Sequence, residues 1–349
     1  MKIQELPLPS FFNPNNSAKW NYRPNNQQLL DMATEWKRQH GVKASGSDKL
    51  KIHLLGIDWN KDFCLPEGTL YVGGRSGTGA IDDSRRFAEF IYRNGHRITK
   101  TTMTMDTHFA YQIFFPAFWI DQEGNHPSPM ITMITVDDVE SGKWKPNPVV
   151  ASWLCSGNYG WLSKQVLHYV QELKKAGKYT LTIWNPHCIL GSDGHALVGV
   201  IQEARMFHSY VRGTQSECEI KGGHPLTENY SVLRPEVLTR FDGQVLAQKN
   251  VSFIRTLMES DIVIIGGEAD SHCVASSIDD LLSEILAKDP SLAKKVYILK
   301  DCMSSVVVPG LIDFTPQADA AHAKFANAGM HLVNSTDPMA SWPGINLTA

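Results

Sequence analysis

The chain has 349 residues, and its 33 Lys and Arg against 36 Asp and Glu give a net charge of −3. Hydrophobic residues make up 42% and charged residues 20%, which excludes a highly charged disordered chain and offers no basic excess for a nucleic-acid-binding protein. No apolar run reaches the roughly 18 residues of a membrane span, and residues 1–12 lack the apolar core of a secretory signal. We therefore expect a cytoplasmic protein of enzyme size, with neither a nucleic-acid nor a membrane partner.

The first 48 residues differ in composition from the rest of the chain. They begin rich in Pro and Asn and then contain one helix-like stretch, from about Gln27 to His40. We interpret residues 1–48 as an N-terminal arm that packs on the main body or on another subunit, which allows for a homo-oligomer. A partly ordered tail is the alternative for the first 20 residues. Residues 49–349 are expected to form one domain.

From Lys51 onward, apolar runs of strand length alternate with amphipathic helical stretches. Strands are predicted at Ile52–Asp58, Arg97–Met105, Tyr179–Trp184, Ser216–Lys221, Ile262–Gly266, Val296–Lys300 and Met330–Val333. Helices are predicted at Thr78–Asn94, Leu162–Ala176, Gln244–Glu259, His272–Ala287 and Gln317–Ala328. This alternation predicts an α/β domain with a parallel sheet and helices on both faces. The long Pro- and Trp-rich segment Phe109–Gly160 fits less well, and we expect a surface excursion there.

In an open parallel sheet, ligands bind beyond the carboxyl ends of the strands, so reactive residues at strand ends are the candidates for chemistry. Six such residues follow predicted strands: Asp58, Asp106, His108, His187, Lys221 and Cys273. Asp106 and His108 are two residues apart on an extended segment, so their side chains point the same way and could hold a divalent metal. Each residue also has an ordinary structural explanation when it is considered alone.

The six cysteines are scattered and include no C-x-x-C pair, so we expect neither a zinc knuckle nor a disulfide framework. Five of them are interpreted as small buried hydrophobic residues. Cys273, in GGEADSHCV, is different because it opens a helix, where free amides and the helix dipole favour a thiolate. The glycine-rich segment Gly73–Gly79 lacks the Lys-Ser/Thr pair of a phosphate-binding loop, so we interpret it as a turn.

Taken together, five segments resemble the isochorismatase-like cysteine hydrolases, and most closely their nicotinamidase branch. In chain order they are LLGIDWNKDFCLPEGTLYVGG (54–74), MDTH (105–108), WNPHCILGSDG (184–194), KGGHPLTENYSVL (221–233) and GGEADSHCVASSIDD (266–280). The resemblance covers about residues 50–335. It implies an isochorismatase-like, Rossmann-like fold with three αβα layers and a mainly parallel sheet of about six strands.

The resemblance also implies a function and a set of site residues. The catalytic triad would be Asp58, Lys221 and Cys273. Backbone amides of Ala269, Asp270 and Cys273 would bind the oxyanion, with a cis peptide near Ala269-Asp270. Asp106, His108 and His187 would bind a divalent metal, zinc by expectation and otherwise iron or manganese. Phe63 and Trp184 would enclose a flat substrate ring. The expected reaction is hydrolysis of nicotinamide to nicotinate and ammonia through a cysteine thioester.

The sequence departs from the family pattern at several positions around the expected substrate. Thr107 replaces an aromatic residue, Asn60 replaces Gln, Asp270-Ser271 replaces Thr-Asp, and His272 replaces an aromatic residue. These departures leave open a related hydrolase that acts on another amide, carbamoyl or ureido compound. A vinyl-ether hydrolase of the isochorismatase type is disfavoured by Cys273. A non-catalytic binding member of the fold is a further alternative.

Overall fold

The computed structural model describes residues 5–177 and 179–347 and is built around a sheet of six parallel strands in the order β12-β9-β8-β1-β2-β7. The strands are β1 (Ile52–Ile57), β2 (Lys100–Asp106), β7 (Glu217–Lys221), β8 (Ile262–Gly267), β9 (Val296–Leu299) and β12 (His331–Val333). All residues of β1, β8 and β9 are buried, as expected for parallel strands covered on both faces. The predicted α/β class with about six strands is confirmed.

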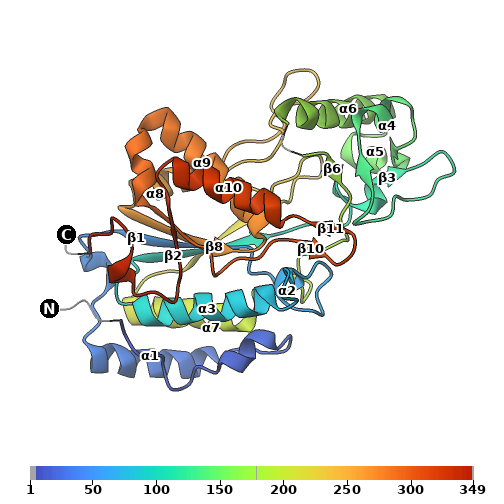
Figure 1. Ribbon diagram of the computed structural model, residues 1–349. Coiled ribbons are helices and arrows are strands. Elements are labelled where there is room, and N and C mark those ends of the chain that lie inside the picture. Colours follow the sequence, from blue (N-terminus) through green and yellow to red (C-terminus); the bar gives the residue numbers. More distant parts are fainter. Residues whose placement is uncertain (1–4, 178, 348–349) are drawn as a thin grey trace.

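Helices cover both faces of this sheet and give the molecule its three layers (Figure 1). One face carries α3 (Gly79–Asn94) and α7 (Gly199–Arg212), and the other carries α8 (Val251–Glu259), α9 (Ala275–Lys288) and α10 (Thr315–Asn327). A separate hydrophobic core lies on each side of the strands. Among the described residues, no helix has both the length and the apolar character that crossing a membrane requires.

The N-terminal segment lies against the outer side of α3 and α7. Its helix α1 (Asn26–His40) packs on α7, and the short turn Pro14–Ala18 contacts both α3 and α7. Arg212, at the end of α7, is almost completely buried and donates to the Lys43 carbonyl and the Asp48 carboxylate. A buried guanidinium with these partners ties the segment to the body.

A second group of elements projects from one end of the sheet, coloured green in Figure 1, and we call residues 116–182 the lateral lobe. It contains α4 (Val136–Glu140), α5 (Pro148–Leu154), α6 (Tyr159–Ala176) and four two-residue strands, β3 (Trp119–Ile120), β4 (Met133–Ile134), β5 (Lys145–Pro146) and β6 (Leu181–Thr182). The pairs β3–β5 and β4–β6 are antiparallel and separate from the central sheet. Two further short elements, α2 (Lys61–Cys64) and the hairpin β10 (Val307–Val308) with β11 (Ile312–Asp313), lie near the carboxyl edge.

The structure corrects two secondary-structure predictions and adds a helix that was not predicted. The segment Tyr179–Trp184 does not add a strand to the central sheet, because its core, β6, pairs only with β4 of the lobe. The helix predicted at Gln244–Glu259 begins at Val251, where Asn250 caps its first turn. Helix α7 was not predicted, although Val200, Ala204 and Val211 recur at helical spacing and are buried.

Candidate active site

The order of the strands brings the candidate residues together at the carboxyl edge of the sheet. Asp58 directly follows β1, while Asp106 and Lys221 end the neighbouring strands β2 and β7 and are register partners. On the other side of β1, strand β8 leads into the single π-helical turn Asp270–Val274, which carries Cys273. Parallel strands that end at one edge therefore bring three predicted triad positions and one predicted metal ligand into contact.

Gly267 is required where β8 turns toward Cys273. Its φ of 144° lies in a region that L side chains rarely adopt, and a Cβ there would lie 2.1 Å from the Ile57 carbonyl oxygen. The close approach of β8 to β1 therefore depends on a residue without a side chain. This contact sets how near the Cys273 turn lies to Asp58.

The Lys221 ammonium lies between the other charged and reactive groups of the site. Its Nζ lies 2.8 Å from Asp58 Oδ2, 2.9 Å from Asp106 Oδ1 and 3.5 Å from Cys273 Sγ. It also donates to the Asn229 carbonyl at 2.9 Å, so four polar groups surround the ammonium. Burial alone would lower the pKa of Lys221, but the charges of Asp106 and Asp58 raise it well above its usual value. The lysine is therefore a fixed cation between two carboxylates and a thiol.

Asp58 is suited to exchange a proton with Cys273. It is fully buried, and burial raises the pKa of its carboxyl against the lowering effect of Lys221. Thr104 donates its hydroxyl to Oδ1 and accepts the Asp58 backbone N–H, so the carboxyl group is fixed in orientation. Burial raises the pKa of the neighbouring Cys273 thiol and Lys221 opposes the shift, while the charge of Asp58 also raises that pKa. The thiolate expected from the position at a helix start is therefore not favoured, and Cys273 lies as a thiol beside the Asp58 carboxyl.

The backbone around Cys273 leaves two of the three expected oxyanion donors available. The Asp270 amide already donates to the Ser304 carbonyl at 2.8 Å, so it is not free to bind an oxyanion. The Ala269 and Cys273 amides make no backbone hydrogen bond outside their own turn among the described residues. The cis peptide predicted near Ala269-Asp270 lies one residue earlier, between Glu268 and Ala269.

Asp106, His108 and His187 form a cluster with the chemistry of a metal site. Their ligand atoms lie within 4.8 Å of one another, and all three residues are buried. Asp106 Oδ2 is 2.7 Å from His108 Nε2 and 3.3 Å from His187 Nε2. The Nδ1 atoms of both rings face backbone carbonyls. His108 Nδ1 lies 3.0 Å from the Gly222 carbonyl oxygen, and His187 Nδ1 lies 2.7 Å from the Asn185 carbonyl oxygen.

This arrangement fits a metal ion, because imidazoles that donate from Nδ1 keep an unprotonated Nε2 for coordination. One carboxylate with two imidazoles leaves positions open for water or substrate and suits zinc, iron or manganese. Asn60, a departure from the family pattern, contributes nearby by accepting the Asp106 backbone N–H at 3.2 Å and donating to the Asp106 carbonyl at 3.2 Å. It therefore fixes the end of β2 to the end of β1.

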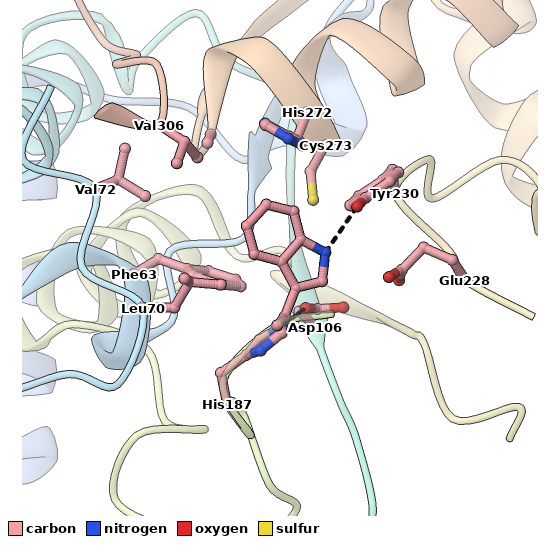
Figure 2. A pocket seen from close by; sticks show the side chains of 12 residues that line it. Phe63, Leu70, Val72, Asp106, His187, Glu228, Tyr230, His272, Cys273 and Val306 are labelled. Atoms are coloured by element: carbon pink, nitrogen blue, oxygen red, sulfur yellow. Dashed lines mark hydrogen bonds and ion pairs between the residues drawn. The ribbon is translucent and has the colours of Figure 1, made fainter. Parts of the chain in front are cut away.

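A narrow pocket with a volume of about 30 Å³ lies above Cys273, and Figure 2 shows its sulfur facing the space. Both predicted pocket residues, Phe63 and Trp184, line it, together with Leu70, Val72, Asp106, His187, Glu228, Tyr230, Ala269, His272 and Val306. The Trp184 indole N–H donates to the Tyr230 hydroxyl at 2.9 Å, the dashed line in Figure 2. Mainly apolar and aromatic walls with a few polar groups are typical of a site for a small molecule.

Sequence reasoning missed Glu228 as a pocket residue. Its carboxyl group is buried yet points into the pocket, across from Phe63 (Figure 2). Burial, and then the charge of Asp106, raise the pKa of Glu228 well above its usual value. Its position in the sequence could have indicated this role, because Glu228 and Tyr230 lie within ten residues of Lys221 on the loop that follows β7.

No protein-family model matches the chain, and no curated protein matches it. Solved structures with a similar chain path include an Acinetobacter baumanii nicotinamidase/pyrazinamidase, with 17% identity, coverage of 83% of this chain and 99% of that one, and a TM-score of 0.48. The pyrazinamidase of Pyrococcus horikoshii in complex with zinc has 15% identity, covers 81% and 99%, and has a TM-score of 0.43. The yeast nicotinamidase bound to the inhibitor nicotinaldehyde has 13% identity, covers 81% and 99%, and has a TM-score of 0.46.

All three structures are of proteins named nicotinamidase or pyrazinamidase, and the sequence segments resemble the nicotinamidase branch. At such identities and TM-scores they assign neither a substrate nor acting residues to this chain. The case for an activity therefore depends on the geometry of the site.

Proposed function

We propose that this protein hydrolyses a small carboxamide to the acid and ammonia, with nicotinamide as the substrate and Cys273 as the nucleophile. The observation that carries the proposal is the position of Lys221 Nζ, which touches Asp58, Asp106 and the Cys273 sulfur at the base of an apolar pocket. A base, a thiol and a fixed cation in contact are the parts that cysteine-dependent acyl transfer needs.

In the first half-reaction, Asp58 takes the Cys273 thiol proton as the sulfur attacks the amide carbonyl carbon. The C–S bond forms, the carbonyl oxygen becomes an oxyanion, and the Ala269 and Cys273 amides are the donors that stabilise it. Each such donor is typically worth about 3–4 kcal/mol in the transition state. The C–N bond then breaks while Asp58 returns the proton to the nitrogen, so ammonia leaves and a thioester remains.

In the second half-reaction, Asp58 takes a proton from water, and the resulting hydroxide adds to the thioester carbon. The C–S bond breaks, the acid is released, and the proton on Asp58 restores the Cys273 thiol. Lys221 keeps its charge throughout and balances the negative charge that moves between Asp58 and the sulfur. No other proton carrier is needed, because one carboxyl group serves both halves in turn.

Asp106, His108 and His187 would hold a divalent metal, with zinc as the proposed ion. When bound, the metal would orient or polarise the substrate without supplying the nucleophile. The role of the protein at this point is to bring two Nε2 atoms and a carboxylate together, with Asp106 and His187 at the wall of the pocket. A ring nitrogen of the substrate would face this cluster while the carboxamide lies over Cys273.

Glu228 favours a second candidate substrate class. Its carboxyl group is the one acidic side chain, apart from Asp106, among the described residues that line the pocket. A carboxyl group there could accept hydrogen bonds from the additional N–H groups of a carbamoyl or ureido compound. The same triad would cleave the C–N bond of such a substrate.

Ammonia release from nicotinamide, benzamide and a ureido compound at equal concentration tests the proposal. Nicotinamide should be cleaved about 10²-fold faster than benzamide, because benzamide has the same shape but no ring nitrogen. This ratio should shrink in His187→Ala. Faster cleavage of the ureido compound would select the second class, and no ammonia from any amide would indicate a non-catalytic binding protein.

A further inference from the structure

One ion pair joins helix α10 to the turn that carries Cys273. His322 Nε2, on α10, lies 2.9 Å from Asp270 Oδ1, and the two side chains are only 14% and 11% exposed. Neither atom has another polar partner among the described residues. Figure 1 shows α10 lying beside α9 over the sheet, so a late segment of the chain reaches the nucleophile turn.

Asp270 is placed where its position affects the reacting groups. It lies between Ala269 and Cys273, one residue after the first and three before the second. The backbone amides of these two residues are the oxyanion donors proposed above. Its backbone N–H donates to the Ser304 carbonyl, and its backbone carbonyl accepts the Ala275 N–H. The third contact of Asp270 is the ion pair between its carboxylate and His322.

We propose that His322 is a positioning residue that, as a cation, holds the Asp270 carboxylate and through it the turn carrying the Cys273 sulfur. Asp270 is only 8% exposed, and a buried carboxylate that loses its partner is strongly destabilised. The turn would then move to hydrate the carboxylate. Such a movement would shift the sulfur away from Lys221 and misplace the two amides.

The charges around His322 come from three elements. Asp270 faces it from the nucleophile turn, Asp319 from its own helix, and Lys300 from the end of β9. Burial lowers the pKa of His322, but the adjacent Asp270 carboxylate, together with Asp319, raises it overall, while Lys300 opposes them. The ion pair is therefore complete below the pKa of His322 and is lost as the pH rises through it.

The first test compares His322→Gln with Lys324→Ala, a variant that removes the neighbouring α10–α9 ion pair with Asp279 and leaves the turn alone. His322→Gln should lower kcat for amide hydrolysis about tenfold with little change in KM, because reacting groups displaced by a fraction of an ångström react much more slowly. It should also lose the alkaline fall in kcat caused by His322 deprotonation. Lys324→Ala should retain both kcat and this pH profile.

Asp270→Asn gives a second variant, nearly identical in shape and uncharged. It should lose the same alkaline fall, and adding His322→Gln to it should cost less than about twofold, since two residues that act through one contact are not additive. Additive losses would overturn the proposal. So would an Asp270→Asn variant that keeps both full kcat and the alkaline fall.

The turnover readout depends on the proposed function, so a second readout uses the thiol itself. The rate of Cys273 alkylation by iodoacetamide, measured by mass spectrometry, should fall several-fold in His322→Gln and in Asp270→Asn, because the sulfur loses the Lys221 charge that lowers its pKa. Lys324→Ala should alkylate at the wild-type rate. Unchanged alkylation in both His322→Gln and Asp270→Asn would refute the positioning role, even if no amide proves to be a substrate.

Discussion

The sheet edge and the lateral lobe contribute different things to the site. The edge supplies Asp58, Asp106 and Lys221 from the ends of three adjacent strands, which are fixed by the parallel register. The chain returning from the lobe supplies Trp184 and His187, which follow β6 and belong to no strand of the central sheet. The three proposed reacting groups at the edge therefore lie at strand ends, whereas one pocket wall and one proposed metal ligand lie on irregular chain.

This difference separates two kinds of variant. Changes at the sheet edge should act on kcat, because they remove groups that take part in bond making and breaking. Changes in the segment that follows the lobe should act mainly on KM and on the choice of amide, because they reshape contacts with the substrate. The two regions can thus be tested against each other in one assay.

The largest effect is expected at the nucleophile turn. Cys273→Ala should retain the fold and lose amide hydrolysis by about 10³-fold or more, since the thioester can no longer form. The matched control is Cys218→Ala on β7, which should keep full activity. The interpretation of Cys218 as buried was wrong, since its thiol lies on an exposed position of this edge strand. Ammonia release and a thermal melt of each variant provide the measurement, and an active, folded Cys273→Ala protein would overturn the proposed mechanism.

The second effect concerns the metal cluster, to which both regions contribute. Elemental analysis should find about one transition metal per chain, because two imidazoles and a carboxylate converge. The metal should be lost in His108→Ala and in His187→Ala. His195→Gln is the control, since His195 contacts Thr107 at 2.8 Å and lies outside the ligand set. The proposed metal would be contradicted if metal-free wild-type protein kept full activity and His108→Ala changed neither activity nor metal content.

The sheet edge was the more predictable of the two regions. Asp58, Asp106 and Lys221 each end or follow an apolar run of strand length, and strand ends of a parallel sheet meet at one edge. The short motifs around them added the expected partners, including Cys273. Because the period of the apolar residues and the positions of strand ends carry this information, both the α/β class and the meeting of these three residues could be predicted. His187 was placed by its motif alone, since the segment before it is not a strand of the central sheet.

The pocket walls were less predictable, for a physical reason. Tyr230 and Glu228 come from a loop, and no periodic pattern reports which way a loop side chain points. Tyr179–Trp184 has the composition of a buried strand, yet its neighbours in space are lobe residues, so β6 pairs with β4. The engaged amide of Asp270 depends on Ser304, which is distant in sequence. Tertiary contacts of this kind leave no local signal.

A smaller effect is expected at the pocket wall. Tyr230→Phe removes the partner of the Trp184 indole N–H, and a neutral hydrogen bond is worth about 1 kcal/mol, or roughly fivefold in KM. The value of kcat should stay within about twofold, because no proton passes through this pair. Steady-state kinetics on the preferred amide provide the measurement, and a loss confined to kcat would show that the wall also takes part in the chemistry.

The smallest effect on activity is expected at His53, near the amino end of β1 and away from the site at the carboxyl edge. Burial, and then the charge of Lys100, lower the pKa of His53 to about 3, so this ring stays neutral in the folded protein. In the unfolded chain a histidine titrates near pH 6.5, so this contribution to stability is complete above that pH and declines as the pH falls toward 3. Between pH 7.5 and pH 5 the decline should amount to about 2 kcal/mol.

His53→Gln should remove this part of the acid sensitivity while leaving kcat unchanged. Urea unfolding of both proteins at pH 7.5 and pH 5 measures the difference. An equal loss of stability on acidification in the two proteins would contradict the assignment of a neutral, buried His53.

The central claim is that an acyl group passes through the Cys273 sulfur. A reaction with the preferred amide, quenched in acid within one turnover and analysed by mass spectrometry, should reveal protein heavier by the acyl group. Peptide mapping should locate that mass on Cys273 and not on Cys188, which is also buried close to Asp106. Continued turnover with an adduct on another residue, or with the mass on Cys188, would contradict the account.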